Sequence, residues 1–349
     1  MSLYDVVRPI VFQIDPERAH HLVAGGLSAV DGTPIQRALR TTLAVEDDRL
    51  GSEAFGLTFP NPIGVAAGFD KNGTFPGALG ALGFGFAEVG GVTPDPREGN
   101  PRPRIFRLVE DRGIVNRMGL NNEGAAVVGD RLRERTDAHP VGVNLAVGDD
   151  CTDEPTAYRE SYAGVAGAGD FYVINVSCPN AEGVRDLQDR GRLEAIVEAL
   201  DDAGASPLLV KVSPDLSEGA LNDVVEVVEQ FGLAGLVATN TTTDRPDDLS
   251  SAARDQTGGL SGRPLANRST EVVRSLARRT DKPIVGVGGV FTAADAYEKL
   301  RAGASLVQVY TGLIYRGPTV ARSINRGLLR LMERDGYGSV ENVVGADLE

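Results

Sequence analysis

Residues 208–212 read LLVKV, residues 235–239 read GLVAT and residues 284–287 read IVGV, and a segment of helical composition follows each run. Five more runs of this kind occupy residues 63–67, 84–92, 141–147, 171–176 and 306–310. Strands that are apolar throughout, rather than in alternation, are buried on both faces, as parallel strands covered by helices are. Eight such strand–helix units over roughly 270 residues predict a (β/α)8 TIM barrel, and an open doubly wound sheet is the alternative.

The first 45 residues lie outside this repeat, and we expect a two-helix extension at residues 1–45 before a barrel at residues 46–349. Apolar residues share one helical face between Leu3 and Ile14, and again between Ala19 and Val30. Between these stripes, Asp15-Pro16-Glu17 has the N-cap, the proline and the acidic first turn that begin a helix. The extension either plugs the bottom of the barrel or forms an apolar platform that contacts a membrane or admits a lipid-like substrate.

The composition excludes several classes of protein. The 349 residues carry 35 basic and 49 acidic side chains, a net charge of −14, and this balance argues against nucleic acid as a partner because phosphate binding needs a basic face. Only four of the basic residues are lysines, and scarce lysine with excess acid indicates adaptation to high salt; a GC-rich genome would explain only the lack of lysine. Two cysteines, no long apolar run and no signal sequence indicate a cytoplasmic protein.

Polar residues end several of the eight runs, and in a barrel these ends meet at the rim that holds the active site. Asn144, Asn175 and Asn240 occupy the same place in three units. Their amides suit a ligand whose edge alternates C=O and N–H groups, such as a pyrimidine ring, although asparagine also favours turns. The glycines of residues 286–289 and 310–312, together with a helix expected after Gly317-Pro318, predict a phosphate site.

Metal and triad chemistry are not expected. The three histidines are His20, His21 and His139, and none follows a strand with a second ligand at metal spacing. No histidine is available on the rim to serve a serine nucleophile.

Five segments read GFDKNG at residues 68–73, NRMGLNN at 116–122, NVSCPN at 175–180, TNTT at 239–242 and TGGLSGRP at 257–264. Together they closely resemble the dihydroorotate dehydrogenase family, and the resemblance covers nearly the whole chain. Residues 12–20, FQIDPERAH, are similar to the N-terminal extension of the membrane-associated, quinone-reducing class two of that family.

The resemblance implies an FMN enzyme that oxidises dihydroorotate to orotate in de novo pyrimidine synthesis. It implies FMN binding by Ala67, Gly68, Phe69, Asp70, Lys71, Gly91, Asn144, Asn175, Lys211, Thr239, Gly262, Gly289, Tyr310 and Thr311. It implies substrate binding by Lys71, Asn116, Arg117, Met118, Gly119, Leu120, Asn175, Asn180, Asn240 and Thr241. Gly91 departs from the family, which often has threonine there.

The resemblance also assigns the catalytic residues. Cys178 matches the base that takes the C5 proton while C6 delivers hydride to the flavin, and Lys211 suits the N1/O2 edge of the flavin. The quinone-reducing class usually has serine as the base, whereas cysteine is typical of class one enzymes that use fumarate or NAD. We expect quinone, because the extension with His20 and Arg107 resembles the class-two acceptor tunnel.

With that acceptor, the protein would lie on the cytoplasmic side of the membrane, attached peripherally through its N-terminal helices. Three alternatives stay open: a class-one-like acceptor, a related flavin barrel that acts on another dihydropyrimidine, and an FMN-binding barrel without chemistry.

Overall fold

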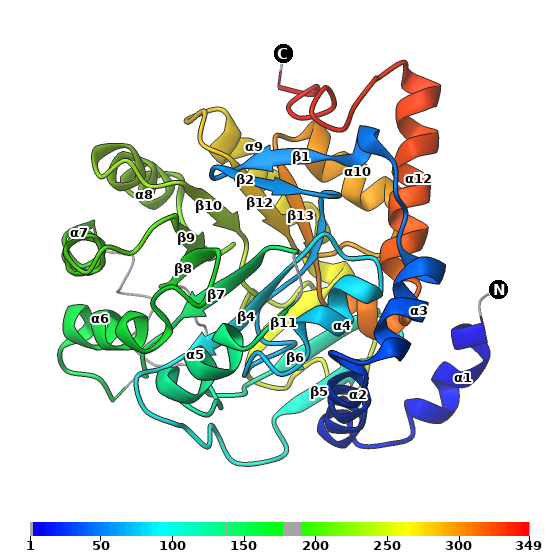
Figure 1. Ribbon diagram of the computed structural model, residues 1–349, viewed down its shortest axis with the longest axis horizontal. Coiled ribbons are helices and arrows are strands. Elements are labelled where there is room, and N and C mark those ends of the chain that lie inside the picture. Colours follow the sequence, from blue (N-terminus) through cyan, green and yellow to red (C-terminus); the bar gives the residue numbers. More distant parts are fainter. Residues whose placement is uncertain (1–2, 137–138, 149, 177–189, 349) are drawn as a thin grey trace.

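The computed structural model describes residues 3–136, 139–148, 150–176 and 190–348. Eight parallel strands close into a barrel in the order β10-β12-β13-β3-β4-β7-β8-β9 (Figure 1). They are β3 (Ile63–Val65), β4 (Phe86–Val92), β7 (Val141–Leu145), β8 (Phe171–Asn175), β9 (Leu208–Val212), β10 (Gly235–Ala238), β12 (Ile284–Val287) and β13 (Leu306–Val309). Each strand lies within one of the eight predicted runs, so the predicted (β/α)8 barrel is confirmed and the doubly wound sheet is wrong.

Helices surround the barrel and cover the outer face of its strands (Figure 1). They are α4 (Pro76–Ala81), α5 (Ala125–Arg133), α6 (Glu154–Val165), α7 (Arg190–Asp202), α8 (Glu218–Gln230), α9 (Ala266–Ala277), α10 (Ala293–Arg301) and α12 (Val320–Asp335), with the short α11 (Thr311–Arg316) after β13. Helix α8 illustrates the local logic: the Ser217 hydroxyl accepts the Ala220 N–H, and Leu221, Val224 and Val228 then form a buried stripe.

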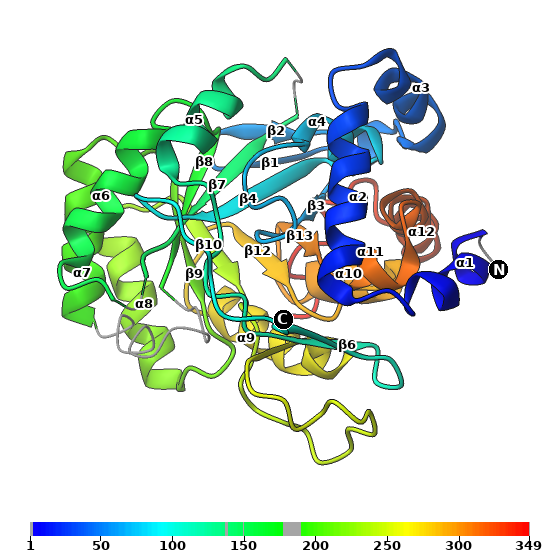
Figure 2. The same cartoon turned by 90° about the horizontal axis from the view of Figure 1, so that it is seen from below.

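A small antiparallel sheet lies outside the barrel at the carboxyl ends of its strands. The hairpin of β5 (Ile105–Leu108) and β6 (Gly113–Asn116) follows β4, and β11 (Gly259–Gly262) follows β10 and pairs with β6. Figure 2 shows this sheet and the chain around it projecting from one end of the barrel. The insertion brings residues 113–122 and 259–262 to the active-site rim; a one-turn helix, η3 (Arg263–Leu265), then leads into α9.

A second hairpin closes the opposite end of the barrel. Strands β1 (Ser52–Ala54) and β2 (Leu57–Phe59) follow the one-turn helix η1 (Asp48–Leu50) and precede β3. The Phe59 ring packs edge-on against Phe86, with 5.3 Å between ring centroids, and Phe55 packs against Phe171. Because these aromatic side chains fill the amino end of the barrel, the N-terminal helices do not plug it.

Three helices, α1 (Leu3–Val11), α2 (Pro16–Val30) and α3 (Pro34–Leu43), precede the barrel. The sequence patterns predict the first two; α3, which begins with Pro34 after Thr33, follows them. Helix α1 contacts α11, α2 contacts α4 and β5, and α3 packs on α4. Within the described residues, no helix combines the length and the apolar composition that crossing a membrane requires.

Candidate active site

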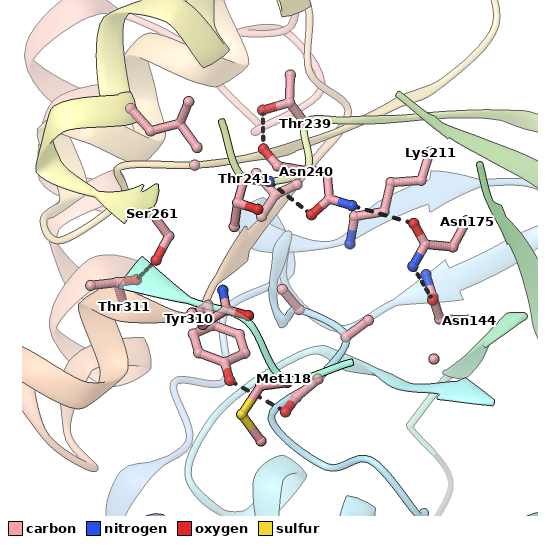
Figure 3. A pocket seen from close by; sticks show the side chains of 18 of the residues that line it. Met118, Asn144, Asn175, Lys211, Thr239, Asn240, Thr241, Ser261, Tyr310 and Thr311 are labelled. Carbon is pink, nitrogen blue, oxygen red and sulfur yellow. Dashed lines mark hydrogen bonds between the residues drawn. The ribbon is translucent and has the colours of Figure 1, made fainter. Parts of the chain in front are cut away.

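A cavity at the carboxyl ends of the barrel strands gathers most of the predicted site residues (Figure 3). Those that line it are Ala67, Gly68, Lys71, Gly91, Asn116, Met118, Gly119, Leu120, Asn144, Asn175, Lys211, Thr239, Asn240, Thr241, Gly262, Gly289, Tyr310 and Thr311. Ser261, Leu265 and Val290 also line the cavity, and the sequence analysis did not assign them to the site. Ser261 has a sequence signal, because it lies beside Gly262 in the TGGLSGRP segment.

Three predicted residues lie near the cavity without lining it. Asp70 is buried and accepts hydrogen bonds from the backbone N–H groups of Thr74 and Phe75, so it shapes the loop after β3. Arg117 donates to the Thr257 carbonyl oxygen at 3.1 Å and turns away from the cavity. Phe69 lines a second, apolar cavity, described below. Predicted residues Cys178 and Asn180 lie outside the described residues.

The three predicted asparagines form a hydrogen-bonded chain across the cavity floor (Figure 3). Asn175 Nδ2 donates to Asn144 Oδ1 at 3.0 Å, and Asn240 Nδ2 donates to Asn175 Oδ1 at 3.3 Å. The Thr241 N–H donates to Asn240 Oδ1 at 2.8 Å and ends the chain. The amides of three strand–helix units therefore interact with one another. Asn144 and Asn175 lie on β7 and β8, and Asn240 follows β10.

Lys211 reaches the cavity from near the carboxyl end of β9. Its side chain is 7% exposed, and its Nζ lies 3.7 Å from Oε1 of Glu88, which is fully buried inside the barrel. The sequence analysis did not single out Glu88, although a carboxylate within the apolar run 84–92 is itself a signal. The pair places one compensated ammonium group beside the amide chain.

Lys71 offers a second ammonium group on the opposite side of the cavity. Its Nζ donates to the Gly68 carbonyl oxygen at 2.7 Å. Burial and the charge of Arg104 lower the pKa of Lys71 to about 8, although Glu17 and Asp70 oppose the shift. Lys71 is therefore a cation at neutral pH.

Backbone rather than side chains forms the other end of the cavity. Gly289 has a φ of +73°, and a Cβ there would overlap the Cα of Ala266 at the start of α9. A Cβ at Gly312 would likewise overlap the Val290 carbonyl oxygen. These close approaches leave a narrow region lined by main chain, next to the Thr311 and Ser261 hydroxyls, which are 2.8 Å apart. Such a region suits a phosphate group.

An apolar cavity adjoins the polar one and lies between the N-terminal helices and the barrel. Helix α2 contributes Ala19, His20, Val23 and Leu27, and Phe12 comes from the turn between α1 and α2. The barrel side contributes Phe69, Leu313 and Pro318. The two cavities share Lys71, Asn116, Met118, Ser261 and Tyr310. These five side chains form the boundary between a polar and an apolar compartment.

His20 and Arg107 both line the apolar cavity. The family resemblance of the sequence had led us to expect these two residues together. Burial, with the charges of Lys71 and His21, lowers the pKa of His20 to about 3, so the imidazole is neutral at neutral pH. Its ring packs edge-on against Phe69, with 5.4 Å between centroids. Arg107 donates to the Ile14 carbonyl oxygen at 2.8 Å and lies over the Phe12 ring, which fixes the extension to β5.

A closed (β/α)8 barrel with converging amides and lysines at the carboxyl ends of its strands defines an enzyme of the TIM-barrel class. An apolar cavity adjoins the polar one in this enzyme.

Comparisons with known proteins identify the family. The sequence model described as dihydroorotate dehydrogenase matches residues 49–332. A relative named dihydroorotate dehydrogenase (quinone) from Natronomonas pharaonis is 57% identical, and one of the same name from Haloarcula marismortui is 55% identical; both alignments cover 100% of this chain and of the relative. The crystal structure of DHODH from Eimeria tenella in complex with ferulenol superimposes with a TM-score of 0.89 at 37% identity, covering 97% of this chain and 98% of that one.

This chain belongs to the dihydroorotate dehydrogenase family. Its haloarchaeal relatives agree with the salt-adapted composition.

Proposed function

We propose that this chain oxidises dihydroorotate to orotate and passes the two electrons through FMN to a quinone, in the de novo synthesis of pyrimidines. The observation that carries the proposal is the contact between a polar, amide-lined cavity and an apolar one at Lys71 and Tyr310. A polar substrate and an apolar acceptor can then approach one cofactor from two compartments. The names of the haloarchaeal relatives, dihydroorotate dehydrogenase (quinone), support the same substrate pair.

The residues of the polar cavity fit FMN. The main-chain region at Gly289 and Thr311 would hold its phosphate, where side chains leave no obstruction. Asn144 and Lys211 would lie beside the ring, and the Lys211 ammonium would stabilise the negative charge that the ring gains on reduction. When bound, the flavin supplies a two-electron acceptor for hydride. We assign FMN contacts to the remaining residues of the FMN set that line the cavity, which are Ala67, Gly68, Lys71, Gly91, Asn175, Thr239, Gly262 and Tyr310. Phe69 and Asp70 would have supporting roles outside the cavity.

Dihydroorotate must lose a proton from C5 and a hydride from C6. We assign the proton to the thiolate of Cys178, which follows Asn175 at the end of β8 by three residues. A thiol, with an ordinary pKa of about 8.5, is a better base near neutrality than the serine hydroxyl of other quinone-reducing members. The Lys71 ammonium would bind the substrate carboxylate.

The ring of the substrate would bind to side chains from three sides of the cavity. We assign this role to Asn116, Asn175, Asn240 and Thr241, with residues 118–120 closing over the ring. We assign Asn180 to the same role from the sequence motif at residues 175–180 alone. Since an amide offers both donors and acceptors, these asparagines match a ring that alternates C=O and N–H groups. Arg117 would act indirectly, by holding the segment against Thr257.

The apolar cavity would bind the quinone, and we propose residues 1–45 as a unit that faces this acceptor. His20 is neutral, so it would offer the quinone a hydrogen bond rather than a charge. Helices α1 and α2 also expose Val6, Ile10 and Leu22, which are 62%, 66% and 67% exposed. We propose that these apolar side chains contact the membrane peripherally on its cytoplasmic side, where the quinone is dissolved.

The first experiment tests the two half-reactions separately. Dihydroorotate, added without oxygen, should bleach the flavin absorbance, and a soluble quinone analogue should restore it faster than fumarate or NAD. Cys178→Ala should retain FMN and lose bleaching, and Cys178→Ser should move the rate profile to higher pH. His20→Ala should bleach normally and reoxidise slowly with quinone.

Cys178 is typical of class-one enzymes, which use fumarate or NAD, but the names of the haloarchaeal relatives do not favour that alternative, and the acceptor assay decides between the two. Faster reoxidation by either of these compounds than by quinone would establish that alternative and reject the quinone. Bleaching by dihydrouracil rather than dihydroorotate would reject dihydroorotate as the substrate. Unchanged kinetics in Cys178→Ala would reject Cys178 as the base.

A further inference from the structure

Helices α9 and α10 lie side by side outside β12 and β13 (Figure 1). Lys299, on α10, reaches across to α9 and is buried, with 1% of its surface exposed. Its Nζ donates to the Ser269 hydroxyl at 2.9 Å and to the Thr270 hydroxyl at 3.1 Å. Lys299 lines neither the polar nor the apolar cavity, and the proposed function gives it no role.

Each of the two hydroxyls donates in turn to a main-chain carbonyl. Ser269 Oγ donates to the Val287 carbonyl oxygen at 2.6 Å, and Thr270 Oγ1 donates to the Ala266 carbonyl oxygen at 3.0 Å. Because a carbonyl oxygen can only accept, each hydroxyl commits its hydrogen to the carbonyl and offers its oxygen to the lysine. The lysine nitrogen has a hydrogen for each hydroxyl whether or not it is protonated. Two hydrogen-bonded relays therefore run from Lys299 to the main chain.

The two relays end on opposite sides of one close contact in the main-chain region assigned to the phosphate. Val287 ends β12 and precedes Gly288 and Gly289, and all three residues line the polar cavity. A Cβ at Gly289 would lie 2.3 Å from the Cα of Ala266, and one at Gly288 would lie 2.8 Å from the Cβ of Ser269. The glycine loop therefore packs directly on the start of α9, and each side of this contact is held by one relay.

The bond from Ser269 also fixes the orientation of a peptide group beside the cavity. The Val287 carbonyl oxygen accepts from Ser269 on α9 and from the N–H of Thr239, which follows β10, at 2.8 Å. In a trans peptide the N–H points opposite to the carbonyl, so the N–H of Gly288 is directed away from α9. A main-chain phosphate site works through the direction of such N–H groups.

We propose that Lys299 is a positioning residue, which holds residues 287–289 in the conformation that binds the phosphate of FMN by way of the Ser269 and Thr270 hydroxyls. The inference rests on the proposed function, in which this loop receives that phosphate. Without the lysine, each hydroxyl loses the donor that fixes its direction, and the contact between the loop and α9 loosens on both sides.

The experiment measures how fast the FMN-loaded protein releases its flavin after dilution, from the fluorescence of free flavin. The same protein loaded with riboflavin serves for comparison, because riboflavin has the ring and lacks the phosphate. Lys299→Met keeps the length of the side chain and removes its donors. This variant should release FMN about tenfold faster, the scale of one lost hydrogen bond, and release riboflavin within about twofold of the wild-type rate. Its FMN-loaded form should bind orotate within about twofold of wild type, since the loop lies at the phosphate end of the cavity.

Two further variants each break one relay and leave Lys299 in place. Ser269→Ala and Thr270→Val should each speed the release of FMN about threefold and leave the release of riboflavin unchanged.

Tyr162→Phe is the matched control for the loss of a buried hydroxyl. Tyr162 lies on α6, away from α9 and α10 (Figure 1), and its hydroxyl donates to the Gly204 carbonyl oxygen at 3.0 Å. This variant should release both flavins within about twofold of the wild-type rates.

Several results would overturn the inference: release of FMN at the wild-type rate by Lys299→Met, an equal acceleration for FMN and riboflavin, an accompanying loss of orotate affinity of about tenfold, or selective release of FMN by Tyr162→Phe. If Lys299→Met does not fold, Ser269→Ala and Thr270→Val decide. If the wild type does not retain riboflavin, the orotate comparison decides in its place. Failure of the proposed function is distinct, because wild-type flavin would then not be bleached by dihydroorotate.

Discussion

The buried Lys299 predicts a pH dependence of stability that can be measured. Lys299 lies on α10 with 1% of its surface exposed, and its Nζ donates to the Ser269 and Thr270 hydroxyls at 2.9 and 3.1 Å. Among the residues that the structure describes, no carboxylate forms an ion pair with it. Burial lowers the pKa of Lys299 to about 7, and the charges of Glu298 and Asp295 oppose this shift only in part.

The sign and size of the change in stability with pH follow from the difference in bound protons between the folded and unfolded states. In the unfolded chain a lysine has a pKa of about 10.4, so between pH 7 and pH 10 the unfolded state holds a proton that the folded state has lost. Stability therefore rises with pH across this window and falls as pH drops toward the folded-state pKa of about 7. Lys299 alone contributes about 1.3 kcal/mol between pH 8 and pH 9, and about 3 to 4 kcal/mol over the whole window.

Urea unfolding of the wild type and Lys299→Met at constant salt, at pH 7, 8 and 9, isolates this contribution. Other titrating groups are common to both proteins, so their effects cancel in the difference between the two free energies of unfolding. That difference should shift in favour of the wild type by about 1.3 kcal/mol from pH 8 to pH 9. Lys282→Met, at a partly exposed lysine, serves as the control for losing a hydrated ammonium group. Parallel pH curves for the wild type and Lys299→Met would refute the reasoning.

Three further predictions concern the site and its support. Because burial and the charge of Arg104 lower the pKa of Lys71 to about 8, orotate should bind more weakly above pH 8, toward tenfold per unit, in titrations of the flavin absorbance; constant affinity up to pH 9.5 would contradict this. Arg104 Nη2 lies 2.7 Å from Glu17 Oε1, and Glu17→Gln breaks this buried ion pair. The substitution should lower the free energy of unfolding, measured in urea, by about 3 to 5 kcal/mol. A loss below about 1 kcal/mol would show that the pair is dispensable. Gly289→Ala places a Cβ against Ala266, so the purified variant should carry less than a tenth of the wild-type FMN by absorbance, and full occupancy would remove this loop from the phosphate site.

The barrel could be predicted because its strands are buried on both faces. Each of the eight apolar runs is long enough to be distinguished from its flanking helices, and each contains one strand of the barrel. The β1–β2 hairpin and the β5–β6–β11 sheet lack that signal. Strands β1, β2 and β5 are three or four residues long and mix buried positions with partly or fully exposed ones, so their sequences resemble those of loops. Strands β6 and β11 are mostly buried, but each is only four residues long and contains glycine.

The site could be predicted in part for a related reason. Residues that end parallel strands must converge on one rim, which is why Asn144, Asn175 and Lys211 meet around one cavity. No such rule fixes the direction in which a side chain of a loop points. Asp70 and Arg117 lie next to lining residues in sequence, yet backbone hydrogen bonds turn both side chains away.

The four lysines of this chain show what the acidic, arginine-rich composition conceals. Lys211 and Lys299 are buried, Lys71 borders two cavities, and only Lys282 stands partly exposed outside any cavity. Lys299 has two hydroxyl acceptors, and an arginine there would bury five N–H donors against the same two oxygens. Lys211 has one carboxylate oxygen nearby and otherwise faces the cavity. A compact ammonium fits both places, and a guanidinium would leave unpaired donors that cost more than the substitution gains. Three of the four lysines in this chain therefore lie where burial or a cavity limits the number of acceptors, and a compact ammonium suits those places.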